Sequence, residues 1–250
     1  MTRRLIVNAD DFGLSSGVNL GILAAHKEGI VTSTTLMVNM PGARDAFELA
    51  QATPTLGVGI HFTLDAGKPV ADCVDSLVGP DGQFMKLLAL KESARPDHLE
   101  REMYAQFEAF LASGLVPTHV DSHHHVCGHL PAAEEVMLAI AAEYRVPARH
   151  FGFQRERFQR HGVETADHFA PYFYGKESIT VDHLLQIILG LEPGVTELMC
   201  HPAYLDHHVL KGSSYAAERV AELATLTDPH VKEMLQAMGV RLISYRELQD

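Results

Sequence analysis

Histidines crowd one short segment of the chain, HVDSHHHVCGH, which spans residues 119–129. Imidazole nitrogens and carboxylate oxygens are common ligands of divalent metals, and imidazole also titrates near neutral pH. Alternate side chains of an extended strand share one face, so we expect His119, Asp121, His123 and His125 on the same side. Adjacent histidines at the end of a strand favour a metal site over a solvated turn.

Titratable residues also end three other predicted strands. Asp10 and Asp11 follow the apolar run RLIVNA, His61 ends LGVGIHF, and His201 ends VTELMCH. Each has a structural explanation when it is taken alone, since the aspartates could cap the next helix and a histidine could simply form a hydrogen bond. Their common position at strand ends favours a single site. Two adjacent buried carboxylates also need a counter-charge, which a divalent cation would provide.

Strands that alternate with helices are expected to position these residues. The predicted strands span residues 4–9, 32–38, 56–62, 118–124, 146–151, 195–201 and 240–244. The predicted helices span residues 15–28, 43–53, 96–111, 130–144, 181–191, 215–226 and 228–238. Residues 63–95 contain several glycines and prolines without a clear period, and they are expected to form a long loop.

This alternation predicts an α/β fold with a parallel sheet, because parallel neighbours need a crossover connection. About seven strands favour an irregular (β/α) barrel, which we expect to form one domain over residues 1–250. Catalytic residues of such barrels lie at the carboxyl ends of the strands, where the titratable residues are predicted to gather. A nucleotide-binding Rossmann fold is the weaker alternative, because the glycine spacing of its fingerprint is missing after the first strand.

The composition narrows the range of partners. Hydrophobic residues make up 46% of the chain and charged residues 21%, which is typical of a globular protein. The formal net charge of -12 disfavours nucleic acid and anionic membranes, so a neutral substrate is expected. Three widely spaced cysteines favour a reducing compartment. The apolar runs are too short for a signal peptide or a membrane span, so we expect a cytoplasmic protein.

Five motifs, taken in order, resemble one known family. NADDFGLS, TSTTLMVN, GIHFTLDAGKPV, THVDSHHHV and ELMCHP are similar to segments of the YdjC-like carbohydrate deacetylases, and the resemblance covers nearly the whole chain. Members deacetylate N-acetylated sugars, including chitin-derived oligosaccharides, and a related branch is associated with hopanoid biosynthesis. The resemblance implies a metal-dependent hydrolase that releases acetate from such a sugar or from a lipid-linked glucosamine. It also implies the irregular barrel and, as in many members, a homodimer.

The resemblance assigns roles to particular residues. Asp11, His61 and His125 correspond to the metal ligands, and Asp10 corresponds to the general base. The metal is Mg²⁺ by this resemblance, whereas an Asp–His–His set would also suit Zn²⁺, so the ion stays open. A divalent cation in this place lowers the pKa of a bound water and polarises the acetamide carbonyl.

The leaving amine must be protonated during the reaction. His201 is the candidate acid, because imidazole titrates near the working pH, and His124 or His123 is the alternative. Asp121 is a candidate for orienting one of these imidazoles, with a purely structural hydrogen bond as the competing explanation.

Contacts outside the metal site are expected from two regions. The loop 63–95 follows His61 and could form a lid or a sugar-binding wall, and its Lys68 belongs to a motif of the family resemblance. Arg149 could reach the site from the fifth predicted strand, although a surface position is the expectation that we favour.

Three other functions use similar residues. A metal-dependent phosphoesterase would share the Asp and His ligands, but it would need more lysine or arginine near the motifs. A non-catalytic sugar-binding protein with a structural metal would have no use for the spare carboxylate of Asp10. A glycosidase would need paired carboxylates but not the histidines.

Overall fold

The computed structural model describes residues 2–150 and 155–249, and in this part of the chain seven strands form one sheet. The strands are β1 (Arg3–Phe12), β2 (Ser33–Leu36), β3 (Gly57–Phe62), β4 (Val120–Ser122), β5 (His168–Ala170), β6 (Gly194–Cys200) and β7 (Arg241–Leu242). All the strand pairs are parallel, in the order β4-β3-β2-β1-β6-β5, and β7 pairs with β1. The sheet curves into a half-barrel, so the predicted irregular (β/α) barrel is confirmed.

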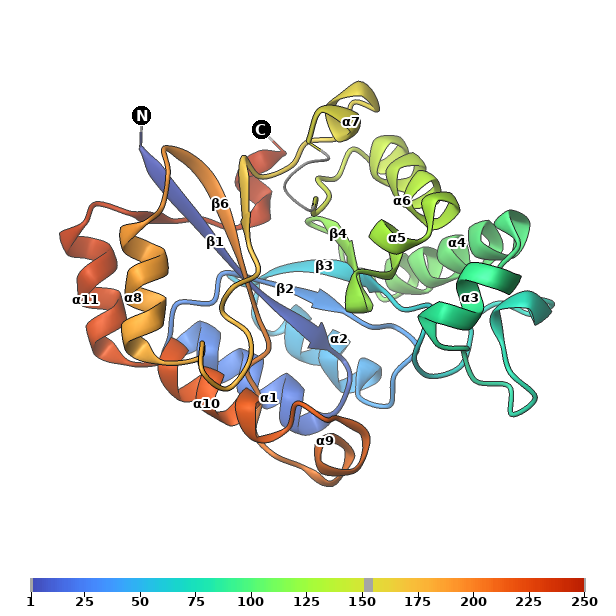
Figure 1. The fold of residues 1–250 in the computed structure, drawn as a ribbon, viewed down its shortest axis with the longest axis horizontal. Coiled ribbons are helices and arrows are strands. Elements are labelled where there is room, and N and C mark those ends of the chain that lie inside the picture. Colours follow the sequence, from blue (N-terminus) through green and yellow to red (C-terminus); the bar gives the residue numbers. More distant parts are fainter. Residues whose placement is uncertain (1, 151–154, 250) are drawn as a thin grey trace.

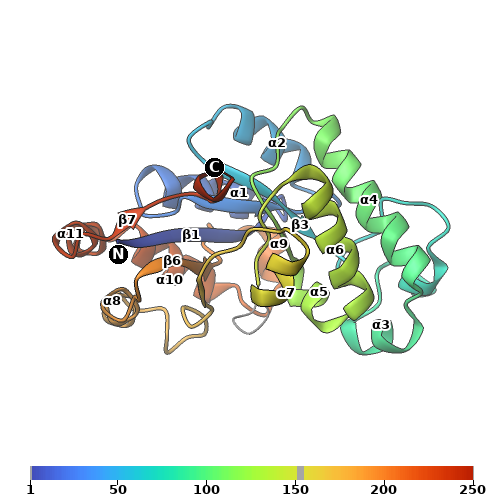
Figure 2. The same cartoon turned by 90° about the horizontal axis from the view of Figure 1, so that it is seen from above.

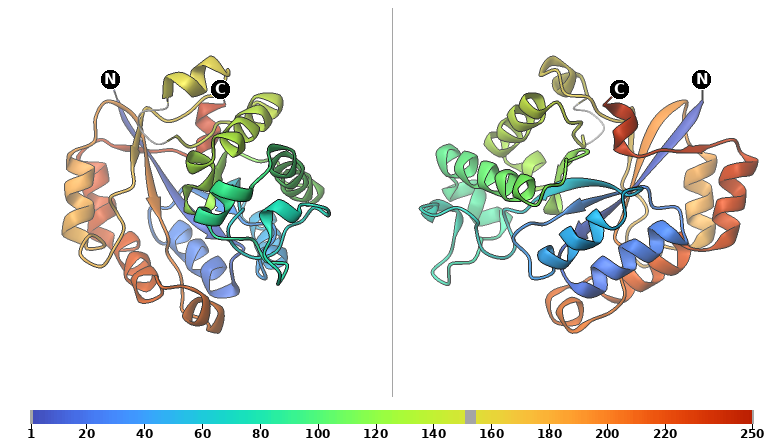
Figure 3. Two further views of the ribbon diagram at one scale, coloured as in Figure 1. Left: turned by 45° about the vertical axis from the view of Figure 1, so that its right-hand side comes forward. Right: turned by 180° about the vertical axis from the view of Figure 1, so that it is seen from behind.

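Helices pack around the outside of this sheet (Figure 1). They are α1 (Ser16–Lys27), α2 (Ala43–Gln51), α3 (Leu87–Ser93), α4 (Pro96–Ala112), α5 (Val126–His129), α6 (Pro131–Tyr144), α7 (Arg155–Arg160), α8 (Val181–Leu189), α9 (His207–Gly212), α10 (Ala217–Leu226) and α11 (Pro229–Ala237). Helices α8 and α11 lie together at one end of the molecule, and α4 and α6 lie together at the other (Figure 2). Between them, α1 packs against both β1 and α10 (Figure 3).

Strand β1 lies in the middle of the sheet and separates two environments. Leu5, Val7 and Ala9 belong to the main hydrophobic core with the helices, whereas Ile6 belongs to a small second cluster. Because side chains alternate along a strand, Asn8 and Asp10 share the face of Ile6. The strand is buried from its third residue onward, so these two polar side chains need partners inside the half-barrel.

The histidine segment does not stay extended as expected. Strand β4 ends at Ser122, and residues 123–125 form a 3-10 turn. The backbone of His124 and His125 is left-handed, with φ of 47° and 55°. The alternate-face prediction was therefore wrong beyond Asp121, because the chain turns immediately after the strand. His119 is fully buried and stacks on Tyr245 at 3.9 Å.

Further segments differ from the sequence-based prediction, among them β5, α7 and α9, which were not predicted. The expected long loop at 63–95 contains helix α3 and a short 3-10 turn at Asp75–Leu77. The predicted strand at 146–151 is reduced to an isolated bridge between Val120 and Ala148, and Phe151 lies outside the described residues. Short amphipathic helices between glycines and prolines carry too few turns to show a period, which is why α3 was missed. None of the helices in the described part of the chain combines the length and apolar character needed to cross a membrane.

Candidate active site

A pocket of about 670 Å³ lies at the carboxyl ends of the strands. This volume is within the range of about 300–1,000 Å³ that is common for small-molecule sites. The titratable residues that line the pocket are Asp10, Asp11, His61, Lys86, His123, His124, His125, His201, His208, Tyr174, Tyr215 and Arg219. The structure therefore brings together the residues that end β1, β3, β4 and β6.

Asp10 is held by a buried arginine. Both carboxylate oxygens of Asp10 accept hydrogen bonds from Arg149 at 2.7 Å, and Asn8 donates a third hydrogen bond at 2.9 Å. Burial alone would raise the pKa of Asp10, but the charge of Arg149 outweighs this and lowers it. Asp10 is thus kept ionised, and its orientation is fixed. Arg149 is 1% exposed, so the surface position that we favoured was wrong.

The same guanidinium also forms ion pairs with two more buried carboxylates. Arg149 lies 3.0 Å from Asp121 and 2.7 Å from Glu197. Burial opposes the charged form of Arg149, yet the carboxylates of Asp10, Asp121 and Glu197 raise the pKa of Arg149 well above the usual value. A single cation therefore organises the inner face of the half-barrel below the pocket.

His61 is oriented toward Asp11 by a carboxylate behind it. Its Nδ1 lies 2.5 Å from Asp121, and since a carboxylate only accepts, Nδ1 carries the proton. Nε2 then faces Asp11, with 3.4 Å between this nitrogen and Oδ1. Such a carboxylate–imidazole pair is the usual support of a metal-ligating histidine. Burial disfavours the imidazolium form, but Asp121 and Asp11 raise the pKa of His61 to about 10, so a divalent cation bound by Asp11 and His61 would replace the proton on Nε2.

His125 lines the same pocket from the turn after β4. Burial and the charge of Arg149 lower the pKa of His125 to about 3, so this imidazole is neutral, as a metal ligand must be. Asp11 itself has a left-handed backbone with φ of 70°, like His124 and His125. Left-handed backbone at non-glycine residues is costly and gathers at functional sites, where the surrounding structure maintains it.

Ligand geometry alone would group Asp10, His61 and Asp121 around a cation, because their ligand atoms lie within 4.8 Å of one another. Arg149, however, already forms ion pairs with both of those carboxylates, and Asp121 accepts a hydrogen bond from Nδ1 of His61. The Nε2 side faces Asp11 instead, so Asp11 is the better partner of His61 for a cation.

Asp11 also has a cationic neighbour. Arg219 on α10 donates a hydrogen bond from Nη2 to Asp11 Oδ2 at 2.6 Å. Burial disfavours the charged carboxylate, but the charge of Arg219 and the hydrogen bond with His61 lower the pKa of Asp11 well below its usual value. Oδ1, which faces His61, is left for another positive charge.

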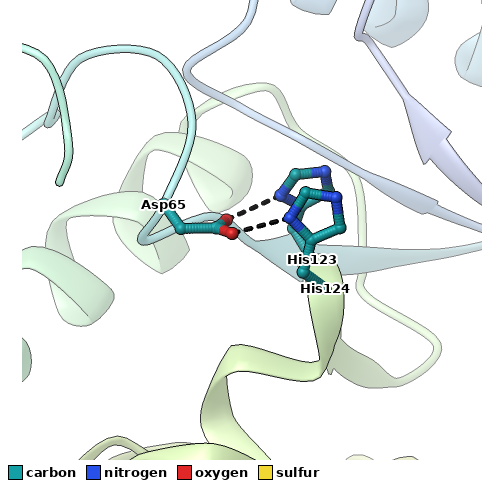
Figure 4. A group of neighbouring side chains, drawn as sticks. All are labelled: Asp65, His123 and His124. Atoms are coloured by element: carbon teal, nitrogen blue, oxygen red, sulfur yellow. Dashed lines mark hydrogen bonds and ion pairs between the residues drawn. The ribbon is translucent and has the colours of Figure 1, made fainter. Parts of the chain in front are cut away.

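Asp65 joins two histidines of the cluster (Figure 4). Its carboxylate oxygens each lie 2.7 Å from an imidazole Nδ1, one from His123 and one from His124. The two rings are tilted by 34° to each other, with centroids 3.7 Å apart. Because the buried carboxylate of Asp65 takes both Nδ1 protons, the Nε2 atoms point away from it, and that of His123 lies 3.9 Å from Asp11. Lys86 donates to the backbone oxygen of Asp65.

His201 follows β6, which lies on the other side of β1 from β4 and the histidines after it. Its Nε2 is 3.9 Å from Asp10 Oδ2, and its ring contacts Tyr174 and Tyr215, which stack on each other at 4.4 Å. Burial lowers the pKa of His201 to about 4. His201 therefore does not titrate near the working pH in the resting protein, contrary to the sequence-based expectation, because burial cannot be read from the sequence.

Sequence reasoning and structure differ on several other residues. Lys68 is exposed and does not line the pocket, whereas Lys86 does. Asp65, Arg219 and Glu222 were not predicted. Asp65 carried a weak signal, since it lies four residues after the strand-end His61, but charged residues on a helix such as α10 usually indicate a solvated face.

Known proteins resemble the chain over its whole length. A family model described as YdjC-like protein matches residues 4–237. Proteins named carbohydrate deacetylase from Geobacillus stearothermophilus and Brevibacillus brevis are 49% and 48% identical, over 99% and 98% of this chain and 98% and 99% of their own lengths.

Solved structures resemble it as well. A protein from Enterococcus faecalis, described as a candidate cellobiose-phosphate cleavage protein, superposes with a TM-score of 0.93 at 35% identity over 99% of both chains. A family 4 carbohydrate esterase from Streptomyces lividans has a TM-score of 0.51 at 14% identity over 97% of this chain and 91% of its own, a likeness of fold alone. With the family model and the full-length relatives in agreement, the chain belongs to the YdjC-like protein family.

Proposed function

We propose that the protein is a metal-dependent carbohydrate deacetylase that hydrolyses the acetamide of an N-acetylated sugar and releases acetate. The observation that carries this proposal is the arrangement of two adjacent aspartates with different partners. Asp10 is fixed by Arg149, whereas Asp11 faces the Nε2 of His61. One carboxylate is thereby available for proton transfer and the other for a cation. The names of the full-length relatives support the same reaction class.

A cation would be held by Asp11, His61 and His125. All three line the pocket, Asp121 fixes the tautomer of His61, and His125 is neutral. A divalent ion bound there would lower the pKa of a water molecule and polarise the acetamide carbonyl. Mg²⁺ and Zn²⁺ both remain candidates, because the Asp–His–His set does not distinguish them.

Proton transfer falls to Asp10 and His201. Asp10 accepts the proton of the attacking water, and Arg149 keeps the carboxylate ionised and oriented until it does. His201 protonates the leaving amine from Nε2, the ring atom that faces Asp10 across 3.9 Å. Because the two residues lie next to each other in the pocket, the attacking water can lose a proton and the leaving amine can gain one on the same side of the substrate.

The walls of the pocket suit a sugar. Tyr174 is half exposed and stacks on Tyr215, so an aromatic face is available to a pyranose ring. On the other side, His123 and His124, which are both hydrogen-bonded to Asp65, present imidazole Nε2 atoms that can bind hydroxyl groups. We expect the sugar to lie between these walls.

The test compares reaction classes. Purified protein supplied with a divalent metal is assayed for acetate release from a panel of N-acetylated monosaccharides and chitin-derived oligosaccharides, and for phosphate release from the corresponding sugar phosphates. The proposal predicts acetate release and no phosphate release. Phosphate release alone would support a phosphoesterase, and binding of a sugar without any product would support a non-catalytic binding protein.

A further inference from the structure

Helix α10 places a buried carboxyl group behind the His201 imidazole. Glu222 is fully buried, and one of its oxygens accepts a hydrogen bond from the backbone N–H of His201. The other oxygen, Oε1, accepts a hydrogen bond from the Tyr215 hydroxyl at 2.6 Å. The same Oε1 lies 3.9 Å from Nδ1 of His201. Glu222 therefore holds the backbone of His201 and faces its ring.

The imidazole of His201 lies between two carboxyl groups at equal distances. Nε2 is 3.9 Å from Asp10, and Nδ1 is 3.9 Å from Glu222. Nδ1 is buried and has no hydrogen-bond partner among the residues that the structure describes. A ring movement of about 1 Å toward either carboxyl group would make a normal hydrogen bond. The three groups thus lie next to one another between the pocket and α10, with gaps of 3.9 Å on both sides of the ring.

The charges around these groups decide where the proton resides. The pKa of the His201 imidazole is shifted by the charges of Asp10, Asp11, Arg219 and Arg149. The pKa of the Glu222 carboxyl group is shifted by the charges of Arg219 and Asp10. Burial dominates for both, because it raises the pKa of Glu222 to about 8 and lowers that of His201 to about 4. At neutral pH the resting pair therefore consists of a carboxylic acid and a neutral imidazole.

We propose that Glu222 is a positioning residue that gives a proton to Nδ1 of His201 while Nε2 protonates the leaving amine, an inference that rests on the proposed deacetylase function. As the C–N bond breaks, its electron pair goes to nitrogen, which takes the Nε2 proton. Nδ1 takes the proton of Glu222, which becomes a carboxylate. The products are the amine and acetic acid, which ionises as it leaves.

The reaction cycle conserves its protons without a further reactant. Asp10 holds the proton that it took from water, and it lies beside Nε2 of His201. Return of that proton to Nε2, with release of the Nδ1 proton to Glu222, restores the resting site. A neutral histidine can act as the acid in this arrangement, because the imidazole gains one proton as it loses another.

The variant Glu222→Gln separates this role from a structural one. Glutamine keeps an oxygen that can accept the backbone N–H of His201, but it has no proton to give. Glu102→Gln is the matched control, since Glu102 is also buried, has a raised pKa and accepts backbone N–H groups, from Val70 and Ala71, away from the pocket.

The experiment measures kcat and KM for an N-acetylated sugar and for an activated acetyl ester, whose leaving group needs no proton. We expect Glu222→Gln to lower kcat for the amide on the order of 100-fold, the lower end of what general acid catalysis contributes, with little change in KM or in ester hydrolysis. Glu102→Gln should leave the amide-to-ester ratio unchanged. ¹⁵N NMR of the His201 ring should show altered Nδ1 and Nε2 resonances in Glu222→Gln alone.

Two results would overturn the inference. One is a Glu222→Gln protein with the wild-type amide-to-ester ratio and wild-type His201 resonances. The other is an equal loss of both activities, which would mean that Glu222 only maintains the structure. If wild-type protein released no acetate from any N-acetylated sugar, the proposed function would fail, and the NMR comparison would still decide whether Glu222 controls the His201 imidazole.

Discussion

Arg149 shows how one side chain sets the charge state of its surroundings. It is buried against the carboxylates of Asp10, Asp121 and Glu197. Asp121 orients His61, so Arg149 also holds the group that positions this imidazole. Three buried carboxylates without this cation would have to protonate or take up water. The ionised states on which the proposed chemistry depends therefore follow from a residue that need not touch the substrate.

Replacement of Arg149 should be costly. Arg149→Met leaves three buried carboxylates without a counter-charge, and we expect a loss of about 3–5 kcal/mol in the free energy of unfolding. Arg95→Met is the matched control, because Arg95 pairs with Asp97 and their side chains are 62% and 50% exposed, and it should lose only about 0–1 kcal/mol. Urea denaturation measures both values. Equal losses would mean that Arg149 is not the counter-charge of the buried cluster.

The two aspartates should respond differently to the same substitution. Asp11→Asn replaces a proposed ligand with a neutral amide and should lose the metal. Asp10→Asn should keep the metal and lose about 10²–10⁴-fold in turnover, because it removes the proposed general base. Metal content and acetate release are measured on both variants. If Asp10→Asn emptied the site and Asp11→Asn did not, the two roles would be reversed.

At the scale of elements, the strand ends that carry the site were more predictable than the turn that follows β4. Buried parallel strands are apolar and end in polar residues, so Asp10, Asp11, His61 and His201 could be placed at one edge of the sheet from the sequence. The left-handed turn at His124 and His125 could not be predicted from the sequence, because nothing in a run of histidines shows where the extended strand ends.

Helix α10 was located closely, but its function was not seen. The predicted span 215–226 agrees with Ala217–Leu226. Arg219 and Glu222 lie one turn apart and both point inward, to Asp11 and to His201. Polar residues with this spacing are ordinary on a solvated helix face. Only tertiary contacts reveal that this face is buried.

The carboxyl group that α10 buries should make stability depend on pH. The pKa of Glu222 is about 8 in the folded protein against an ordinary value of 4.5, so between these values the folded state holds the extra proton. Its contribution therefore makes the free energy of unfolding fall as pH rises from 4.5 to 8. Denaturant titrations of wild type and Glu222→Gln over this range should show the smaller decline in the variant. Parallel curves would show that Glu222 ionises normally.

At the scale of the whole molecule, one curved sheet gathers residues that are far apart in the sequence. Asp11, His61, His125 and His201 come from four different strand ends and line one pocket. The chain carries a formal net charge of -12, yet three carboxylates beneath the pocket share Arg149, and Arg219 neutralises Asp11. These four carboxylates outnumber the two guanidinium groups, so the surplus negative charge favours a divalent cation at the pocket. The predicted homodimer and cytoplasmic location stay predictions.

We expect acetate release to depend on a cation held by Asp11, His61 and His125. The most direct measurement follows acetate release from a chitin-derived N-acetylated disaccharide in a single preparation before chelation, after chelation and after a divalent metal is added back, with metal content determined at each stage. We predict that activity disappears with the metal and returns with one ion per chain. Full acetate release by demonstrably metal-free protein would contradict the account.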